Sequence, residues 1–295
     1  MPRRIASDYR PEVLQLFDKY VHGFITRRDF IDRAAAFTLS TAAAAALLET
    51  LTPDFAAGQR VAPDDSSLTT EFIEYDSPNG AGTMRGYLVR RKDAPSRQPG
   101  IVVIHENRGL NPHIEDIARR IALDGYLAFA PDALTPLGGY PGTEDAAREL
   151  FSQLDRARLP NDFVAAFNYL KAHRNCSGNV GAVGFCFGGS MVNQLAVRLP
   201  DLGAGVAFYG GGPDLAEVSK IRAPLMLHYG GLDERVNAGW PDYEKALRSA
   251  GVDYTAYMYE GANHGFNNDT TPRFDEASAE RAWRRTMAFF ERHLN

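Results

Sequence analysis

Residues 184–189 read Gly-Phe-Cys-Phe-Gly-Gly, and they connect a short aliphatic run at 180–183 to a segment with helical spacing that begins near Phe187. A bend this sharp between a strand and a helix crowds the backbone around its central residue, so glycines are required two positions before and after it. The central residue is Cys186, and the amides and positive dipole of the following helix N-terminus favour a thiolate there. We therefore predict that Cys186 is a nucleophile; a buried structural thiol between closely packed elements is the alternative.

The segments on either side of this bend alternate between aliphatic runs and helical patterns. Strands are predicted at 101–104, 126–130, 180–184, 205–209, 224–229 and 254–259, and helices at 114–123, 143–157, 161–173, 187–199, 239–250 and 275–293. Two alternating segments at 69–75 and 83–90 flank a Ser-Pro-Asn-Gly turn and predict an antiparallel hairpin before the first of these strands. The pattern indicates an α/β fold with a mostly parallel central sheet, helices on both faces, and reactive groups gathered at the carboxyl ends of the strands.

Two further polar side chains directly follow predicted strands. His264 lies on a glycine-flanked loop after the last strand, where its imidazole can reach a nucleophile and act as a general base. Asp233 follows the strand at 224–229, and its carboxylate can accept the second imidazole N–H and orient the ring. An isolated aspartate here is often a helix cap and an isolated histidine is often solvated. In the order Cys186, Asp233, His264, however, the three predict a catalytic set.

Composition limits the classes of function. The 32 basic and 37 acidic residues give a net charge of -5 and are spread along the chain, which argues against nucleic acid as a partner. The two cysteines, Cys176 and Cys186, are too few for a disulfide framework or a four-ligand zinc site. We expect neither a metal nor an organic cofactor. Cys176 is interpreted as structural or incidental, and so are the histidines that lack the context of His264, namely His105, His113, His173, His228 and His293.

With these motifs in place, the sequence resembles the dienelactone hydrolase family over roughly residues 69–293. The resemblance is carried by residues 105–111, which read His-Glu-Asn-Arg-Gly-Leu-Asn, by the Gly125-Tyr126 pair that leads to Pro131-Asp132, and by the cysteine bend. It continues in the Leu232-Asp233 turn and in the Asn-His-Gly-Phe loop at 263–266. This resemblance implies an α/β-hydrolase fold and hydrolysis of an ester or lactone bond through a thioester on the cysteine.

The resemblance also implies roles for residues next to the nucleophile. In this family the glutamate that corresponds to Glu106 contacts the resting cysteine and takes part in forming its thiolate when substrate arrives; a salt-bridged structural acid is the alternative. The backbone amides of Asn107 and Phe187 are the oxyanion donors that the family implies. No metal or organic cofactor is required by this chemistry.

Two departures from the family bear on the substrate. Family members that act on dienelactone hold its carboxylate with two arginines, and the corresponding positions here are Pro136 and Asn268. Losing both cations removes charge-assisted hydrogen bonds of roughly 1.5–3 kcal/mol each, so a neutral ester or lactone is favoured. Arg108 could supply a substitute charge or could be a surface residue. The loop 134–142, with Tyr140, is expected to line the pocket mouth.

The N-terminal part of the chain allows two interpretations. Arg27, Arg28 and Phe30 fall on the positions of a twin-arginine export signal, and the uncharged stretch 34–48 matches the apolar region of a signal peptide but is too short to span a bilayer. The alternative is a retained arm with a helix from Pro11 to His22 and a second helix, capped by Thr26, that continues through the alanines. We divide the chain into this signal or arm at 1–57, a linker at 58–68, and a catalytic domain at 69–295.

These interpretations leave several properties open. Export predicts a periplasmic protein and a retained arm allows a cytoplasmic one. The oligomeric state is expected to be a monomer or homodimer, and the partner is a small ester or lactone. A broad carboxylesterase or thioesterase is the nearest alternative, and a binding protein that keeps the fold without catalysis is the alternative from another class.

Overall fold

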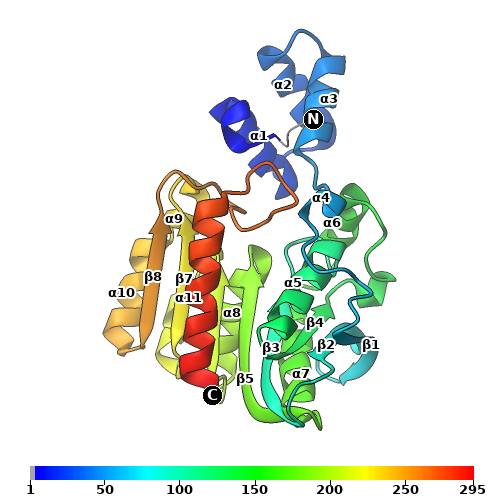
Figure 1. The fold of residues 1–295 in the computed structure, drawn as a ribbon. Helices are drawn as coiled ribbons and strands as arrows, with labels where there is room; N and C mark the ends of the chain where they lie inside the picture. Colours follow the sequence, from blue (N-terminus) through cyan, green and yellow to red (C-terminus); the bar gives the residue numbers. More distant parts are fainter. Residues whose placement is uncertain (1–3) are drawn as a thin grey trace.

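The computed structural model describes residues 4–295, which build an eight-stranded sheet with helices on both faces (Figure 1). The strand order is β1-β2-β4-β3-β5-β6-β7-β8. The strands are β1 (Leu68–Ser77), β2 (Gly82–Arg91), β3 (Gln98–Ile104), β4 (Leu127–Asp132), β5 (Cys176–Phe185), β6 (Ala204–Phe208), β7 (Leu225–Gly230) and β8 (Tyr254–Tyr259). Strands β1 and β2 form the predicted antiparallel hairpin, and β2 also pairs antiparallel with β4, whereas all other pairs are parallel. The predicted α/β class and mostly parallel sheet are confirmed.

Helices cover the sheet in two layers, each with its own apolar core. One layer consists of α5 (Pro112–Leu123) and α11 (Glu276–Leu294), and the other contains α6 (Glu144–Ser152), α7 (Leu159–Ala172), α8 (Phe187–Arg198) and α10 (Trp240–Ala250). The short helix α9 (Glu234–Asn237) follows β7, and 3-10 turns lie at Thr135–Leu137 and Leu215–Lys220. The helix predicted at 143–157 ends at Ser152, because the Asp155 side chain accepts the Ala157 amide and forms a turn in place of another helical turn.

The described part of the N-terminal segment is helical and has a separate core. Its elements are a 3-10 turn at Ala6–Asp8, α1 (Pro11–Val21), α2 (Arg27–Ala34), a 3-10 turn at Ala35–Phe37, α3 (Thr41–Leu51) and α4 (Phe55–Gly58). The prediction of one helix running from Thr26 through the alanines is wrong beyond Phe37. Thr38 is extended, and the Ser40 side chain accepts the Ala43 amide to start α3 as a new helix. Thr26 does cap α2 as expected.

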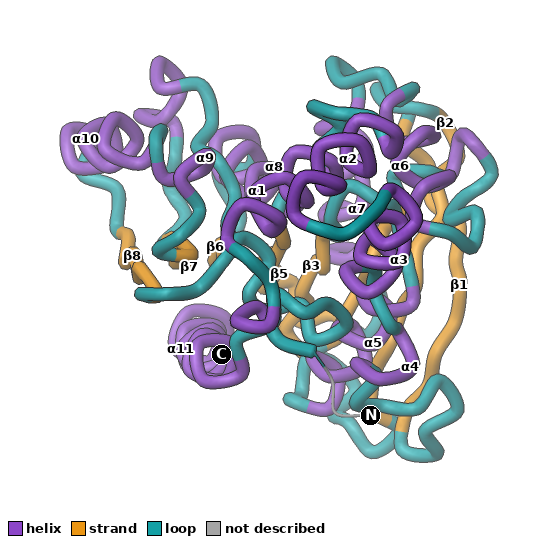
Figure 2. The backbone as a smooth tube through the Cα atoms, turned by 90° about the horizontal axis from the view of Figure 1, so that it is seen from above, coloured by secondary structure: helices purple, strands orange, loops and turns teal. Residues whose placement is uncertain are grey.

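These N-terminal helices, here called the cap (residues 4–58), lie over the carboxyl ends of the parallel strands (Figure 1). Seen from above in Figure 2, α1 lies over the region of β5 and β6, and α2 lies over α7. Arg148 of α6 donates to the Tyr20 carbonyl at 3.0 Å and stacks on the Tyr20 ring, and Tyr20 donates to Asp145. The cap is therefore fastened over the edge where the predicted functional residues gather.

The paired arginines lie within α2, and Arg27 binds Glu49 at 2.6 Å and Asp145 at 3.1 Å. Among residues 4–295 no single helix has the length and apolarity of a membrane span. The bent pair formed by residues 27–37 and 41–58, with 111° between its halves, meets the criterion by length and composition. Export through a twin-arginine signal stays a prediction.

Candidate active site

The bend at Cys186 has the strained geometry that its flanking glycines predict. Strand β5 ends at Phe185 and α8 begins at Phe187, and Cys186 between them has φ 56° and ψ -109°, a conformation that side chains other than glycine rarely adopt. A Cβ on Gly184 would lie 2.1 Å from the Gly188 carbonyl oxygen, and one on Gly188 would lie 2.2 Å from the Ile104 carbonyl oxygen. The glycines thus let α8 approach β3 and β5 closely enough to present the sulfur at the end of the sheet.

Asp233 and His264 form a buried pair beside this sulfur. The Asp233 carboxylate lies 2.5 Å from Nδ1 of His264, and it also accepts the Val236 amide and thereby caps α9. The opposite ring nitrogen, Nε2, is buried without a hydrogen-bond partner among the described residues and lies within 4.8 Å of the Cys186 sulfur. An oriented imidazole with a free nitrogen facing a thiol is the arrangement that a general base requires.

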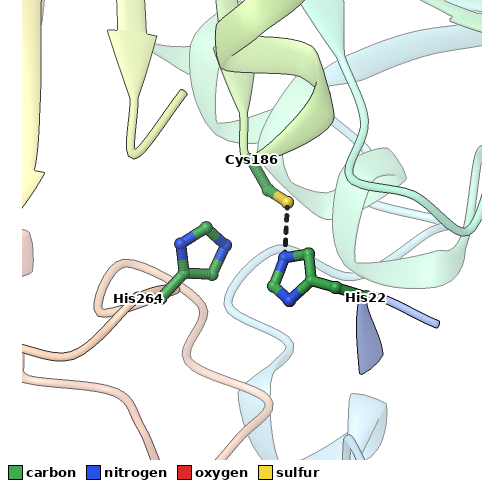
Figure 3. Close-up of side chains that lie close together, drawn as sticks. All are labelled: His22, Cys186 and His264. Carbon is green, nitrogen blue, oxygen red and sulfur yellow. Dashed lines mark hydrogen bonds between the residues drawn. The ribbon is translucent and has the colours of Figure 1, made fainter. Parts of the chain in front are cut away.

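The residue that is hydrogen-bonded to the Cys186 sulfur is one that sequence reasoning missed. Nε2 of His22, at the end of α1 in the cap, lies 3.4 Å from Sγ, and the His22 and His264 rings meet edge to face at 4.8 Å (Figure 3). In the sequence His22 was only the last residue of a predicted helix. No linear motif connects it to a cysteine 164 positions later, and only the folding of the cap over the sheet brings them together.

His22 is itself oriented by an acid. Its Nδ1 lies 2.7 Å from the Asp18 carbonyl oxygen and 3.3 Å from the Asp18 carboxylate, one helical turn earlier. The body of the protein holds that carboxylate in turn, through Arg235 at 3.2 Å and Arg273 at 3.4 Å. The sulfur therefore faces two aspartate–histidine pairs, one from the sheet and one from the cap.

These neighbours shift the pKa values of Cys186, His264 and His22. Burial alone would raise the pKa of the Cys186 thiol, but the charges of His264 and His22 and the bond from His22 lower it to about 6. Burial disfavours the charged form of His264, yet the facing thiolate and the bond to Asp233 raise its pKa to about 10. The pKa of His22 is also raised, since the thiolate and Asp18 outweigh its burial. At neutral pH the site therefore favours a thiolate paired with imidazolium.

The sulfur and the two ring nitrogens also form a possible set of metal ligands. The Cys186, His22 and His264 ligand atoms lie within 4.8 Å of one another, and each imidazole is held by a carboxylate at its other nitrogen. Opposing this, a guanidinium nitrogen of Arg235 lies 2.9 Å from Nε2 of His22. Its positive charge disfavours a second cation at that position.

No hydrogen bond between Glu106 and the Cys186 sulfur is seen among the described residues, and the role that the family resemblance implies for Glu106 stays a prediction. Its carboxylate accepts a hydrogen bond of 3.0 Å from Asn268, which stands where an arginine is expected, and the sulfur's hydrogen-bond partner is His22. Glu106 still lines the small cavity at Cys186. The cap places an imidazole at the sulfur, and Asn268 holds the carboxylate.

Of the two side chains expected to bind substrate, Arg108 lines the cavity at Cys186 and Tyr140 does not. Arg108 is 5% exposed and so is not a surface residue; it lines the cavity at Cys186, donates to the Val21 carbonyl at 3.1 Å, and lies 3.5 Å from Glu144. Asn107 donates through its side chain to the same Val21 carbonyl. Its backbone amide and that of Phe187, the first residue of α8, remain the predicted oxyanion donors.

Tyr140 does not line the cavity at Cys186, contrary to our expectation for the loop 134–142. Its hydroxyl donates to Glu144 at 3.1 Å and its ring packs against Phe55. Together with Gly138 and Gly139 it lines a separate cavity next to β2 and α5. The interactions with Glu144 and with Phe55 of the cap hold Tyr140 at this second cavity.

Two cavities adjoin the reactive groups. The one that contains the Cys186 sulfur has a volume of only about 40 Å³ and is closed by Phe17, Tyr20, Val21 and His22 of the cap. A larger cavity of about 620 Å³ lies between the cap and α9 and reaches His264 and Asp233. Its apolar lining comes mainly from the cap, through Leu14, Phe24 and Ile25.

A strained cysteine between a parallel strand and a helix, with a buried aspartate–histidine pair beside it, defines a hydrolase of the α/β class. The model of the dienelactone hydrolase family matches residues 84–294, and a second model, described as YqhI-like, matches residues 1–37. The chain belongs to the dienelactone hydrolase family, and it is a hydrolase that acts on ester or lactone bonds.

Individual relatives agree with this assignment. A Synechocystis protein named "Putative carboxymethylenebutenolidase" is 32% identical over 235 residues, which cover 74% of this chain and 95% of the relative. A crystal structure of a "Putative Dienelactone Hydrolase" from Klebsiella pneumoniae is 28% identical, with a TM-score of 0.66, and covers 76% of this chain and 99% of its own. An Escherichia coli "Putative hydrolase fragment YghX" is 51% identical over 112 residues, 38% of this chain and 96% of the fragment.

Proposed function

We propose that the protein hydrolyses a neutral ester or lactone through a covalent thioester on Cys186. The observation that supports this most strongly is the placement of the strained Cys186 within 4.8 Å of the unpartnered Nε2 of His264, whose other nitrogen is held by Asp233. A nucleophile, a base and an orienting acid then act together, as in other hydrolases of this class.

The reaction proceeds in two halves. The Cys186 thiolate attacks the carbonyl carbon, and the resulting oxyanion receives hydrogen bonds from the amides of Asn107 and Phe187. The His264 imidazolium gives its proton to the leaving alkoxide as the C–O bond breaks and the thioester forms. Neutral His264 then takes a proton from water while the water oxygen attacks the carbonyl carbon of the thioester. The C–S bond breaks, which releases the acid product and restores the Cys186 thiolate.

The residues at the two family positions that bind a substrate carboxylate favour a neutral acyl group here. The two positions where family members carry carboxylate-binding arginines are Pro136 and Asn268, and the Asn268 amide is engaged by Glu106. Arg108 is committed to the Asn107 and Val21 carbonyls and to Glu144. Without free cations at these positions a substrate carboxylate loses hydrogen bonds of roughly 1.5–3 kcal/mol each.

The proposal is tested with Cys186→Ala, measured on phenyl acetate, on a neutral aromatic lactone and on the same lactone carrying a carboxylate. The wild type should prefer the neutral lactone by about tenfold or more in kcat/KM, the equivalent of one lost charge-assisted bond. The variant should lose at least about a thousandfold in kcat on every substrate, because no other group can form the acyl-enzyme. Cys176→Ala serves as the matched control and should retain full activity.

Full turnover by a folded Cys186→Ala protein would refute the nucleophile. Preference for the carboxylated lactone would refute the substrate class but leave the nucleophile in place. Mass spectrometry of the rapidly quenched wild type should show an acyl adduct on the peptide that contains Cys186.

A further inference from the structure

We propose that Asp18 and His22 form a second acid–imidazole pair, which accepts the Cys186 proton in the closed enzyme and shields the thiolate until a substrate displaces the cap. The inference rests on the proposed function, since it assigns a role relative to a nucleophilic Cys186. It makes His22 a further catalytic residue, because its Nε2 contacts the reacting sulfur at 3.4 Å.

The hydrogen bonds of His22 define it as a proton acceptor. Nδ1 must carry a proton to bind the Asp18 carbonyl oxygen at 2.7 Å, which leaves a lone pair on Nε2 toward the sulfur. Arg235, whose guanidinium only donates, lies 2.9 Å from Nε2; it favours this neutral tautomer but shares the single Nε2 lone pair with the S–H group, so it must release that position when Nε2 takes the proton. The S–H bond of Cys186 can therefore break and an N–H bond form on His22, which leaves a thiolate beside an imidazolium.

Charged and titratable groups on other elements also face the sulfur and His22. They are Glu106 and Arg108 ahead of α5, Glu144 on α6, Tyr209 after β6, Arg235 on α9 and Arg273 ahead of α11. Once His22 is protonated, Arg235 repels it, whereas Asp18 and the thiolate attract it. When the cap moves away, His22 loses its proton to water and the thiolate stays paired with His264.

The cavity at the sulfur is too small to admit a substrate. Its volume of about 40 Å³ leaves room for only a few water molecules, at roughly 10–15 Å³ each, so an ester cannot reach Sγ while His22 is in place. The neighbouring cavity of 620 Å³ is large enough for a small ester and reaches His264. A substrate must therefore displace His22 to react, and the cap acts as a lid with its own imidazole at the nucleophile.

The test follows the rate at which iodoacetamide alkylates Cys186 as a function of pH, with the peptide carrying buried Cys176 as an internal control. His22→Gln keeps much of the side chain's bulk but cannot accept the proton; it should raise the midpoint by roughly one pH unit and leave the limiting rate at high pH nearly unchanged. His22→Ala should raise the midpoint similarly and also increase the limiting rate several-fold, because the sulfur is uncovered.

Two further variants separate loosening of the cap from loss of the His22 imidazole. Arg148→Ala keeps Asp18 and His22 but removes two contacts that fasten α1 to the body; it should increase the limiting rate and shift the midpoint less than His22→Gln does. His173→Gln, a half-buried histidine in the connection between α7 and β5, is the matched control and should reproduce the wild type.

An unchanged midpoint in His22→Gln overturns the proton-accepting role, and an unchanged limiting rate in His22→Ala overturns the shielding role. Either result rejects the inference. Hydrolysis assays on the same proteins separate it from the proposed function, which fails only if Cys186→Ala still turns over ester. If Cys186→Ala is inactive while both His22 variants behave as wild type, the nucleophile stands and only the inference fails.

Discussion

At the scale of single residues, the reactivity of Cys186 arises from the opposition between burial and charge. Burial disfavours every ion in the site, yet the sulfur and the imidazoles stabilise one another's charged forms. Neither partner would ionise in this way without the other. The pH range of activity should therefore be set by the pair.

The first prediction at this scale concerns the pH profile of kcat/KM for phenyl acetate. Activity should rise as pH increases through about 6, where Cys186 becomes a thiolate, and fall through about 10, where His264 loses the proton that the leaving group needs. Asp233→Asn should move the alkaline limb to lower pH, because the bond to Asp233 raises the His264 pKa. An alkaline limb that stays in place in Asp233→Asn would contradict the role of this carboxylate.

At the scale of elements, the contact between α8 and β3 positions the nucleophile. Gly188 lies where a Cβ would be 2.2 Å from the Ile104 carbonyl and 2.7 Å from the His105 carbonyl, both backbone atoms that cannot rotate away. Helix α8 can only accommodate a side chain there by moving away from the strand. Such a shift would displace the Phe187 amide and the sulfur together.

We therefore predict that Gly188→Ala lowers the free energy of unfolding by about 1–3 kcal/mol, the usual cost of overpacking. It should also lower kcat of the protein that remains folded, because the Phe187 amide and the Cys186 sulfur are displaced. Gly211→Ala is the matched control, since its Cβ would meet only Ser190 Oγ at 3.7 Å. Chemical denaturation and steady-state kinetics on both variants provide the measurement, and equal behaviour of the two would contradict the argument.

Elements were predicted well where a single pattern governs them. The short apolar runs became β3 to β7 because a strand buried on both faces needs continuous apolar residues. The run at 254–259 also became a strand, β8, but it lies at the sheet edge and most of its residues are half-buried or exposed. The end of α6 and the break before α3 were missed, since in both places a short polar side chain binds a nearby backbone amide. Such local competition is decided by a single hydrogen bond and leaves the apolar periodicity unchanged.

At the scale of the whole molecule, the cap and the sheet have separate cores and are joined by polar contacts and by a few ring contacts such as Phe55 with Tyr140. The apolar core of the cap includes Phe17, Phe30 and Leu48 and is distinct from the two cores that flank the sheet. Small units with their own core can open without unfolding the rest. This organisation is what a lid over the active site requires.

The prediction at this scale is that Phe30→Ala loosens the cap alone. Phe30 is fully buried, and removing such a ring commonly costs about 3–5 kcal/mol, which is a large part of what a unit this small can possess. Hydrogen exchange should accelerate across α1 to α3 and stay unchanged in β3 to β7. Cooperative acceleration in both parts would show instead that the cap and sheet unfold as one unit.

The sequence alone determined the fold class and the candidate nucleophile, base and acid, because glycine spacing, apolar periodicity and chain order are local properties that survive without coordinates. It determined neither the partner of Glu106 nor the position of Tyr140, and it gave no sign of His22. Those depend on how a separately folded helical segment settles on the sheet, through contacts such as Arg148 with Tyr20 and Arg235 with Asp18, which join residues more than a hundred positions apart. Only tertiary packing decides such pairings, since each is one weak contact among many that the same residues could make.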